Sequence, residues 1–194
     1  MPLTYTVSDD GILSFGSATW SVVRAGAASL VVFDPSAAVA KCRLFAGWYE
    51  LSQLMLYMGM NSLPLCNGNI LNISGTLSTS GGGYGSGRVL EVYRLEYGAL
   101  TTADFVAGAN IASLGPRLAY SGNIAANGSH TLTVDQSAFK NALLDSFNAG
   151  HDFMQMVVVF QNQRTDIAPT DEWSARTSAA FTIEFTNHRV FCHV

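Results

Sequence analysis

Apolar and polar residues alternate along several short stretches of the chain, and this period of two is typical of β-strands with one buried face. In residues 181–186, Phe and Ile alternate with Thr and Glu, and in residues 131–134 Thr alternates with Leu and Val. Residues 71–77 follow the same rule, with Gly75 between the apolar positions. We expect three half-buried strands, with a bulge or a close approach of two segments at Gly75.

Other stretches are apolar at both odd and even positions, as in strands that are buried on both faces. Residues 153–160 form such a run between polar clusters, and residues 51–60 form another. Residues 21–24, 30–33 and 89–95 are short and rich in branched apolar residues, so we predict strands there as well.

Two segments have the marks of helices. Asp135 is placed to cap a helix over about residues 136–148, whose apolar residues fall on one face. Thr101 and Asp104 have the spacing of a capping box, which predicts one short helical turn. The glycine-rich residues 80–87 lack the lysine and the following helix of a phosphate-binding loop, so we predict a flexible hairpin loop.

Strands dominate this prediction. We expect an all-β fold, a β-sandwich or jelly-roll-like domain with one short connecting α-helix at about 136–148. A length of 194 residues fits one domain. Residues 20–194 are assigned to the β-sandwich domain, and residues 1–19 either to an N-terminal arm or to an edge strand of the same domain.

The chain is poor in charge, with 12% charged and 48% hydrophobic residues. Two explanations stay open: other subunits cover part of the surface, or Ser, Thr, Asn and Gly face the water. A net charge of −4 and scattered arginines argue against nucleic acid as a partner. No apolar run is long enough to span a membrane, and residues 1–20 lack the features of a secretory signal.

Residues suited to catalysis are few and scattered. Three cysteines without CxxC spacing are expected to be reduced and buried, although a Cys42–Cys66 disulfide stays open. The four histidines lie outside recognisable catalytic motifs, and the 188–193 tail offers too few ligands for a metal. The oxygen-rich loops lack the spacing of a calcium-binding EF-hand. We therefore expect no enzyme, no cofactor and no metal site.

A surface that binds a ligand or a subunit is the remaining candidate site. The polar loop 161–166, together with aromatic residues, has the composition of a sugar-binding site. The alternative is that the tryptophans anchor the core or a subunit interface, because Trp is favoured in both places. The candidate ligand or interface residues are Trp48, Tyr49, Tyr84, Arg164, Asp166 and Trp173.

The order of several short phrases resembles one known group of modules. The phrases are YELSQLML at 49–56, ILNISGTL at 70–77, LEVYRL at 90–95 and LTTADFVAG at 100–108. This series is similar to the carbohydrate-binding-module-like β-sandwich modules of the DNRLRE type, over about residues 20–186. Those modules recur in bacterial surface proteins and in virion proteins of tailed bacteriophages. They often carry a Trp-rich phrase where this chain has Leu-Thr-Thr at 100–102, so no functional residue is carried over from them.

The resemblance implies a role in assembly. A single module that begins at Met1, has few charges and shows no signal looks like a structural protein of a bacteriophage virion. We expect a capsid decoration or cement protein that forms a homo-oligomer and contacts other virion proteins such as the major capsid protein. The alternative is a carbohydrate-binding module, or a tail or head-fibre component, that recognises host surface glycans. Either role places the protein in the virion, on the capsid surface or in the tail.

Overall fold

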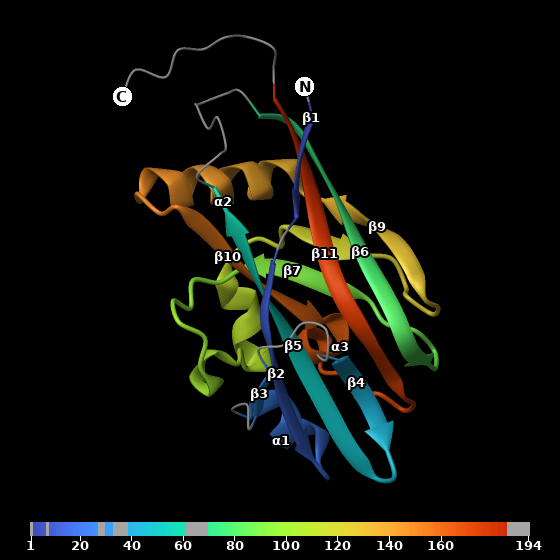
Figure 1. Cartoon of the computed structure of the whole chain (residues 1–194). Coiled ribbons are helices and arrows are strands. Elements are labelled where there is room, and N and C mark those ends of the chain that lie inside the picture. The colour runs from blue at the N-terminus through green and yellow to red at the C-terminus, as the bar shows by residue number, and fades with distance from the viewer. Residues whose placement is uncertain (1, 7, 27–29, 33–38, 61–69, 186–194) are drawn as a thin grey trace.

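A computed structural model describes residues 2–6, 8–26, 30–32, 39–60 and 70–185 of the chain. Eight of its strands close into an antiparallel β-barrel (Figure 1). In order around the ring they are β5, β10, β7, β8, β9, β6, β11 and β4, and β4 pairs in turn with β5. Their bounds are β4 Val39–Phe45, β5 Trp48–Gly59, β6 Ile70–Tyr84, β7 Leu90–Arg94, β8 Ala119–Ser121, β9 Gly128–Val134, β10 Phe153–Phe160 and β11 Trp173–Phe185.

The predicted sandwich or jelly roll is wrong, because β4 closes the ring. It pairs on one side with β5, from Cys42↔Leu51 to Phe45↔Trp48, and on the other with β11, from Lys41↔Ser174 to Val39↔Arg176. A sandwich would leave those two strands at the edges of separate sheets. The strand Val39–Phe45 alternates Lys and Arg with smaller apolar residues, so it too carries a period-two signal, although no strand was predicted there.

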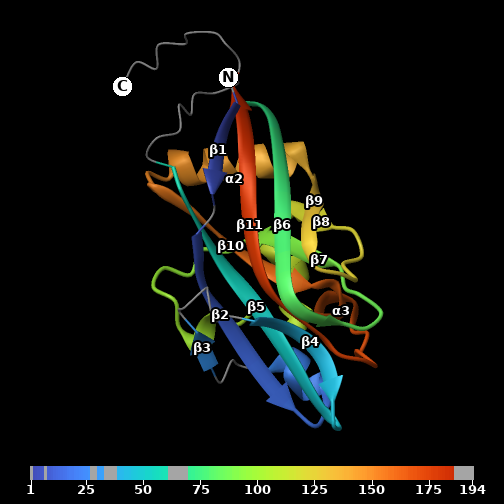
Figure 2. The same ribbon diagram turned by 45° about the vertical axis from the view of Figure 1, so that its right-hand side comes forward.

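The N-terminal strands lie outside this ring. β1 (Pro2–Thr6) pairs with β11, β2 (Ser8–Ser17) pairs with β5, and β3 (Leu30–Val32) pairs with β2. Figures 1 and 2 both show β1 running along β11. Both strands of the 1–19 segment are therefore hydrogen-bonded to the body of this same chain.

Large apolar side chains fill the inside of the barrel and the space between it and α2 (Gln136–Asn148). On β11, every second residue from Trp173 to Phe185 is buried, as the alternation predicts. The Phe139 ring of α2 lies 4.8 Å from the Phe181 ring. A Cβ atom at Gly75 would lie 2.7 Å from Phe181, so the predicted close approach at Gly75 is confirmed.

The predicted helices are confirmed at two places. α2 begins after Asp135, whose Oδ1 accepts a hydrogen bond from Ala138 N at 3.0 Å. The capping box of Thr101 and Asp104 opens a 3-10 turn, η1 (Thr102–Asp104), and a second one, η2 (Gly108–Leu114), follows. Strands are also confirmed for the predicted runs at 51–60, 71–77, 89–95 and 153–160.

Three local predictions are wrong. Residues 21–24 form part of a helix, α1 (Trp20–Ala25), because Trp20 and Val23 are one helical turn apart and both buried. The polar loop at 161–166 contains a short helix, α3 (Gln161–Thr165), which Arg164 helps to fix. The glycine stretch is strand as far as Tyr84, because β6 and β11 stay paired up to Tyr84↔Trp173.

Candidate functional site

The turn between β4 and β5 presents two large aromatic side chains to solvent. Phe45 and Trp48 are directly opposite each other in the hairpin, and they are 57% and 51% exposed. Between them, Ala46 and Gly47 both have positive φ, of 49° and 78°. Two such residues form the tight turn whose twist matches that of the flanking strands. We call residues Phe45, Ala46, Gly47 and Trp48 the aromatic tip.

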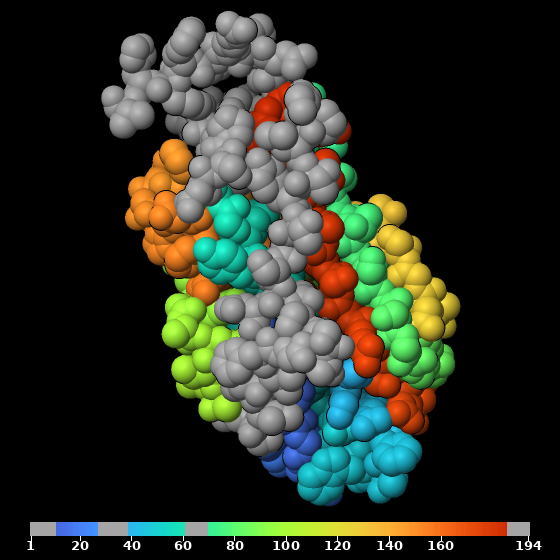
Figure 3. All heavy atoms as spheres, in the orientation of Figure 1, coloured from blue at the N-terminus to red at the C-terminus, as the bar shows by residue number. Residues whose placement is uncertain are grey.

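Both rings of the aromatic tip have defined supports. The guanidinium carbon of Arg43 lies 5.3 Å from the centre of the Phe45 ring, within the range of a cation–π interaction. The Trp48 indole lies over the backbone of Gly16 in β2, where a Cβ atom would be 2.5 Å from Nε1. The tip and α1 lie at the same end of the molecule, opposite the end that carries α2 (Figures 1 and 3). The tip is thus an apolar, preformed projection.

The charges behind the aromatic tip neutralise one another. Arg43 pairs with Glu50 and also, from Nη1 at 2.5 Å, with Glu172, while Lys41 Nζ lies 3.2 Å from Glu50. Burial alone would raise the pKa of Glu50, but the hydrogen bond from Arg43 and the charge of Lys41 outweigh it and lower the pKa. The two cations and two anions carry no net charge together, so this cluster adds no net charge next to the aromatic tip.

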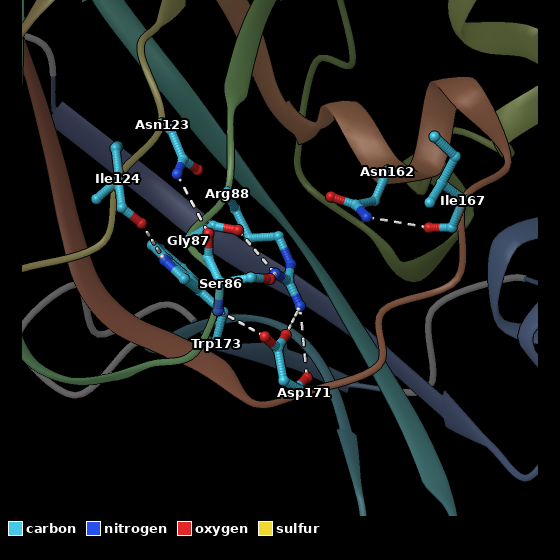
Figure 4. Close-up of polar contacts among 9 residues, drawn as sticks. All are labelled: Ser86, Gly87, Arg88, Asn123, Ile124, Asn162, Ile167, Asp171 and Trp173. Carbon is cyan, nitrogen blue, oxygen red and sulfur yellow. Dashed lines mark hydrogen bonds and ion pairs between the residues drawn. The ribbon is translucent and has the colours of Figure 1, made fainter.

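A second set of charges is buried at the end of the β6–β7 connection (Figure 4). The guanidinium of Arg88, which is 4% exposed, pairs with the Asp171 carboxylate, and its Nη1 donates to Ser86 Oγ at 2.9 Å and to Gly87 O at 2.7 Å. Asp171 Oδ2 accepts from Ser86 N at 2.5 Å. Burial opposes the charge of Asp171, but these hydrogen bonds lower its pKa from 3.8 to about 2. The carboxylate is therefore ionised at neutral pH and holds the connection against the start of β11.

The thiol of Cys42 lies beside Arg88 in the interior. Burial raises the pKa of Cys42 from 9.0 to about 11, and the neighbouring Arg88 opposes that rise only in part. Cys42 is buried and free, as predicted, whereas Cys66 and Cys192 lie outside the described residues. A nucleophilic cysteine needs a thiolate, and this thiol stays protonated at neutral pH.

A third set surrounds Glu91, whose side chain is fully buried on β7. Arg164 binds both of its oxygens, at 2.7 and 2.8 Å, and Arg117 Nη1 binds Oε1 at 2.7 Å. Burial would raise the pKa of Glu91, but the two arginines lower it, while burial and the Glu91 charge raise the pKa of Tyr93 to about 12. A general acid or base works best with a pKa near the working pH. Neither Glu91 nor Tyr93 is suited to that role.

An open hollow of about 300 Å³ lies next to this cluster. The guanidinium carbon of Arg117 lies 3.8 Å from the centre of the Tyr120 ring, and both residues line the hollow. Thr133 and the helix-capping Asp135 line it as well. The volume is at the lower end of the range for ligand clefts, so it suits a small polar ligand.

The predicted site residues do not form one surface. Trp173 is a fully buried core residue: its ring contacts Tyr84 and Phe160 edge-on, and its Nε1 donates to Ile124 O at 2.9 Å (Figure 4). Tyr84 donates to Asn127 Oδ1 at 2.7 Å. Tyr84 and Trp173 thus pack against each other where β6 and β11 form their last pair.

The other predicted residues are at two further places. Trp48 and Tyr49 begin β5, with Trp48 in the aromatic tip and Tyr49 against Trp20 of α1. Arg164 is bound to Glu91, and Asp166 follows α3 with a φ of 59° and lies 3.3 Å from Arg24 Nε. Phe45 was missed, although its position three residues before Trp48, around Ala-Gly, was a readable signal for an aromatic turn.

No group of three or more His, Cys, Asp or Glu residues suited to a metal ion occurs in the part of the chain that the structure describes. None of the helices within those same ranges has the length and apolar character needed to cross a membrane. In comparisons with known proteins, the chain matches no family model and no curated protein.

Proposed function

We propose that the chain is a non-enzymatic structural protein of a bacteriophage virion, which works as a capsid decoration protein and holds neighbouring subunits through the aromatic tip. The observation that carries this proposal is the exposure of Phe45 and Trp48 on a tight turn with defined supports. Aromatic residues are enriched at protein–protein interfaces and dominate their binding energy.

The distribution of charge supports the same role. The ion pairs of Arg88, Glu91 and Arg43 are all made within the chain, where they fix turns and the short helix α3. Few charges are then left to repel a neighbour at the tip, and aromatic rings on a rigid turn lose little conformational entropy when they bind.

Co-sedimentation with phage heads tests this proposal. The full chain is mixed with heads, stripped of decoration, from the phage whose genome carries the gene. We expect the protein to sediment with the heads, and the double variant Phe45→Ser with Trp48→Ser to stay in the supernatant. The control is Leu71→Ser, which removes an equally exposed apolar side chain, 60% exposed, from β6. Failure of the unchanged protein to bind heads would refute the decoration role.

One observation favours the alternative role, recognition of a host surface glycan. The hollow lined by Arg117, Tyr120, Thr133 and Asp135 offers hydroxyl, carboxylate and guanidinium groups to a polar ring. A glycan array tests it: binding that is lost in Thr133→Val but kept in Trp48→Ala would place a sugar in this hollow. An array without binding would remove this alternative.

A further inference from the structure

The N-terminal strand β1 depends on a single neighbour. Its five residues pair with β11 in register, from Pro2↔Glu184 to Thr6↔Ala180. Among the described strands, β1 pairs with no other. Residues 180–184 of β11 pair with β6 on one side and with β1 on the other. Within the described part of the chain, β1 alone covers that second side.

The barrel closes without β1. The strand β4 joins β11 to β5 through residues 174–176 of β11, next to the segment that β1 covers. Removal of β1 therefore leaves the ring of eight strands intact and uncovers one stretch of β11 edge. An uncovered edge presents a row of unpaired N–H and C=O groups, which is a template for another strand.

The connection from β1 to β2 is one residue long. Thr6 is opposite Ala180 of β11, and Ser8 is opposite Tyr57 of β5, so the chain passes from one strand of the barrel to another between these two residues. Short connections between a terminal element and the body of a domain favour exchange of that element between copies.

We propose that, in the assembled protein, β1 of one copy pairs with residues 180–184 of β11 in a neighbouring copy. The strand that would cover this edge of β11 comes from a second copy of the chain, because β1 is the segment that fits the edge in a defined register. Exchange replaces each β1–β11 ladder by an identical one, so it needs no new contacts beyond those of one chain. The inference rests on the proposed function, since exchange links copies only where they assemble, and it adds the element that would link them.

Disulfide trapping between two single variants tests the exchange. Thr4 and Thr182 are directly opposite in the register. Thr4→Cys is made in one chain and Thr182→Cys in a second, affinity-tagged chain, both with Cys66→Ser and Cys192→Ser. The two are mixed, unfolded in urea, refolded together and oxidised. Neither chain carries both introduced thiols, so a disulfide that joins positions 4 and 182 can only link two chains, and exchange is what would hold these two thiols opposite each other.

The matched control replaces Thr182→Cys by Ser178→Cys. Ser178 lies on β11 four residues earlier, on the same outward face, but has no partner in β1. We expect the heterodimer linked through positions 4 and 182 to exceed the one linked through positions 4 and 178 by about tenfold or more. Equal yields of the two heterodimers would overturn the exchange.

The result also separates the two proposals. If the protein binds phage heads through the aromatic tip but gives equal heterodimer yields, exchange is wrong and the decoration role stands. If heterodimers form in register while head binding is absent, exchange stands and the decoration role is wrong.

Discussion

Trp173 and Trp48 each begin a long strand of the barrel, and they have opposite environments. Trp173, the first residue of β11, is fully buried between aromatic rings, with its indole N–H bonded to Ile124 O. Trp48, the first residue of β5, is half exposed at the aromatic tip. Position at a strand start therefore does not decide the role of a tryptophan. What decides it is whether other segments cover that end of the strand.

The charged side chains show the same contrast. Around Trp173, the Arg88–Asp171 pair is largely buried and fixes the β6–β7 connection, whereas the groups behind the aromatic tip are only partly buried. One end of β11 is thus held by internal hydrogen bonds, while the β4–β5 turn projects apolar surface. We expect substitutions at the first region to change stability and substitutions at the second to change assembly.

The largest expected loss of stability follows from Asp171→Ala. The substitution leaves the Arg88 guanidinium buried without its carboxylate, and such a loss costs about 3–5 kcal/mol. Urea unfolding followed by circular dichroism measures it. The control is Glu96→Ala, which removes a more exposed partner of Arg94 and should cost less than about 1 kcal/mol. Equal losses in the two variants would contradict a structural role for the buried pair.

Substitution of the two tryptophans by Phe tests their contrast directly. Trp173→Phe removes one of the two hydrogen bonds to Ile124 O, which also accepts from Arg88 N at 3.1 Å. It also leaves a void in the core, and the two effects together cost about 1–3 kcal/mol. Trp48→Phe keeps an aromatic ring at an exposed position and should change the free energy of unfolding by about 0.5 kcal/mol or less. Thermal unfolding of both variants provides the comparison. A larger loss for Trp48→Phe would reverse the assignment of core and surface.

Acid should weaken the Asp171 region. A carboxyl group whose pKa is lower in the folded than in the unfolded chain stabilises the fold above its ordinary pKa, and this contribution is lost as the pH falls. Asp171 loses this stabilising contribution as the pH falls from 3.8, its ordinary pKa, to about 2, its pKa in the fold. The pKa of Glu50 and of Glu91 is also lowered, with the same sign. Between about pH 5, above this window, and about pH 2.5, inside it, the urea midpoint should fall less in Asp171→Asn than in the unchanged protein. The same fall in both proteins would rule out Asp171 as a source.

The sequence predicts the elements of this fold better than their closure. Periodicity identifies the alternating segment at the end of β11, and Asp135 identifies the start of α2, because both signals are local. The barrel depends on β4 pairing with β5 and also with β11, which lies near the other end of the chain. Local patterns do not specify such a pairing, and an alternating strand suits a sandwich as well as a barrel.

The candidate site was predictable only in part. Trp48 was assigned either to a sugar-binding surface or to the core or a subunit interface, and its exposure excludes the core of this chain. Arg164 was assigned to a ligand surface, but in the fold it binds Glu91, which is 73 residues earlier in the chain. An ion pair between distant residues has no sequence signature, since the residues next to Arg164 in the sequence do not show whether it binds a ligand or Glu91.

A small change in stability is also expected for the double variant Phe45→Ser with Trp48→Ser. Both side chains are at least half exposed, so we expect a loss below about 1 kcal/mol. The unfolded fraction should stay negligible at room temperature, and urea unfolding checks this. A loss of several kcal/mol would instead mean that the aromatic tip belongs to the folding core.

Size-exclusion chromatography with light scattering of this double variant, beside the unchanged protein and Leu71→Ser, tests the central claim that the aromatic tip is an assembly surface. We predict that the unchanged protein and Leu71→Ser elute as multimers and that the double variant elutes as a folded species of smaller mass. A multimer of unchanged size in the double variant, or a strict monomer in the unchanged protein, would contradict the claim.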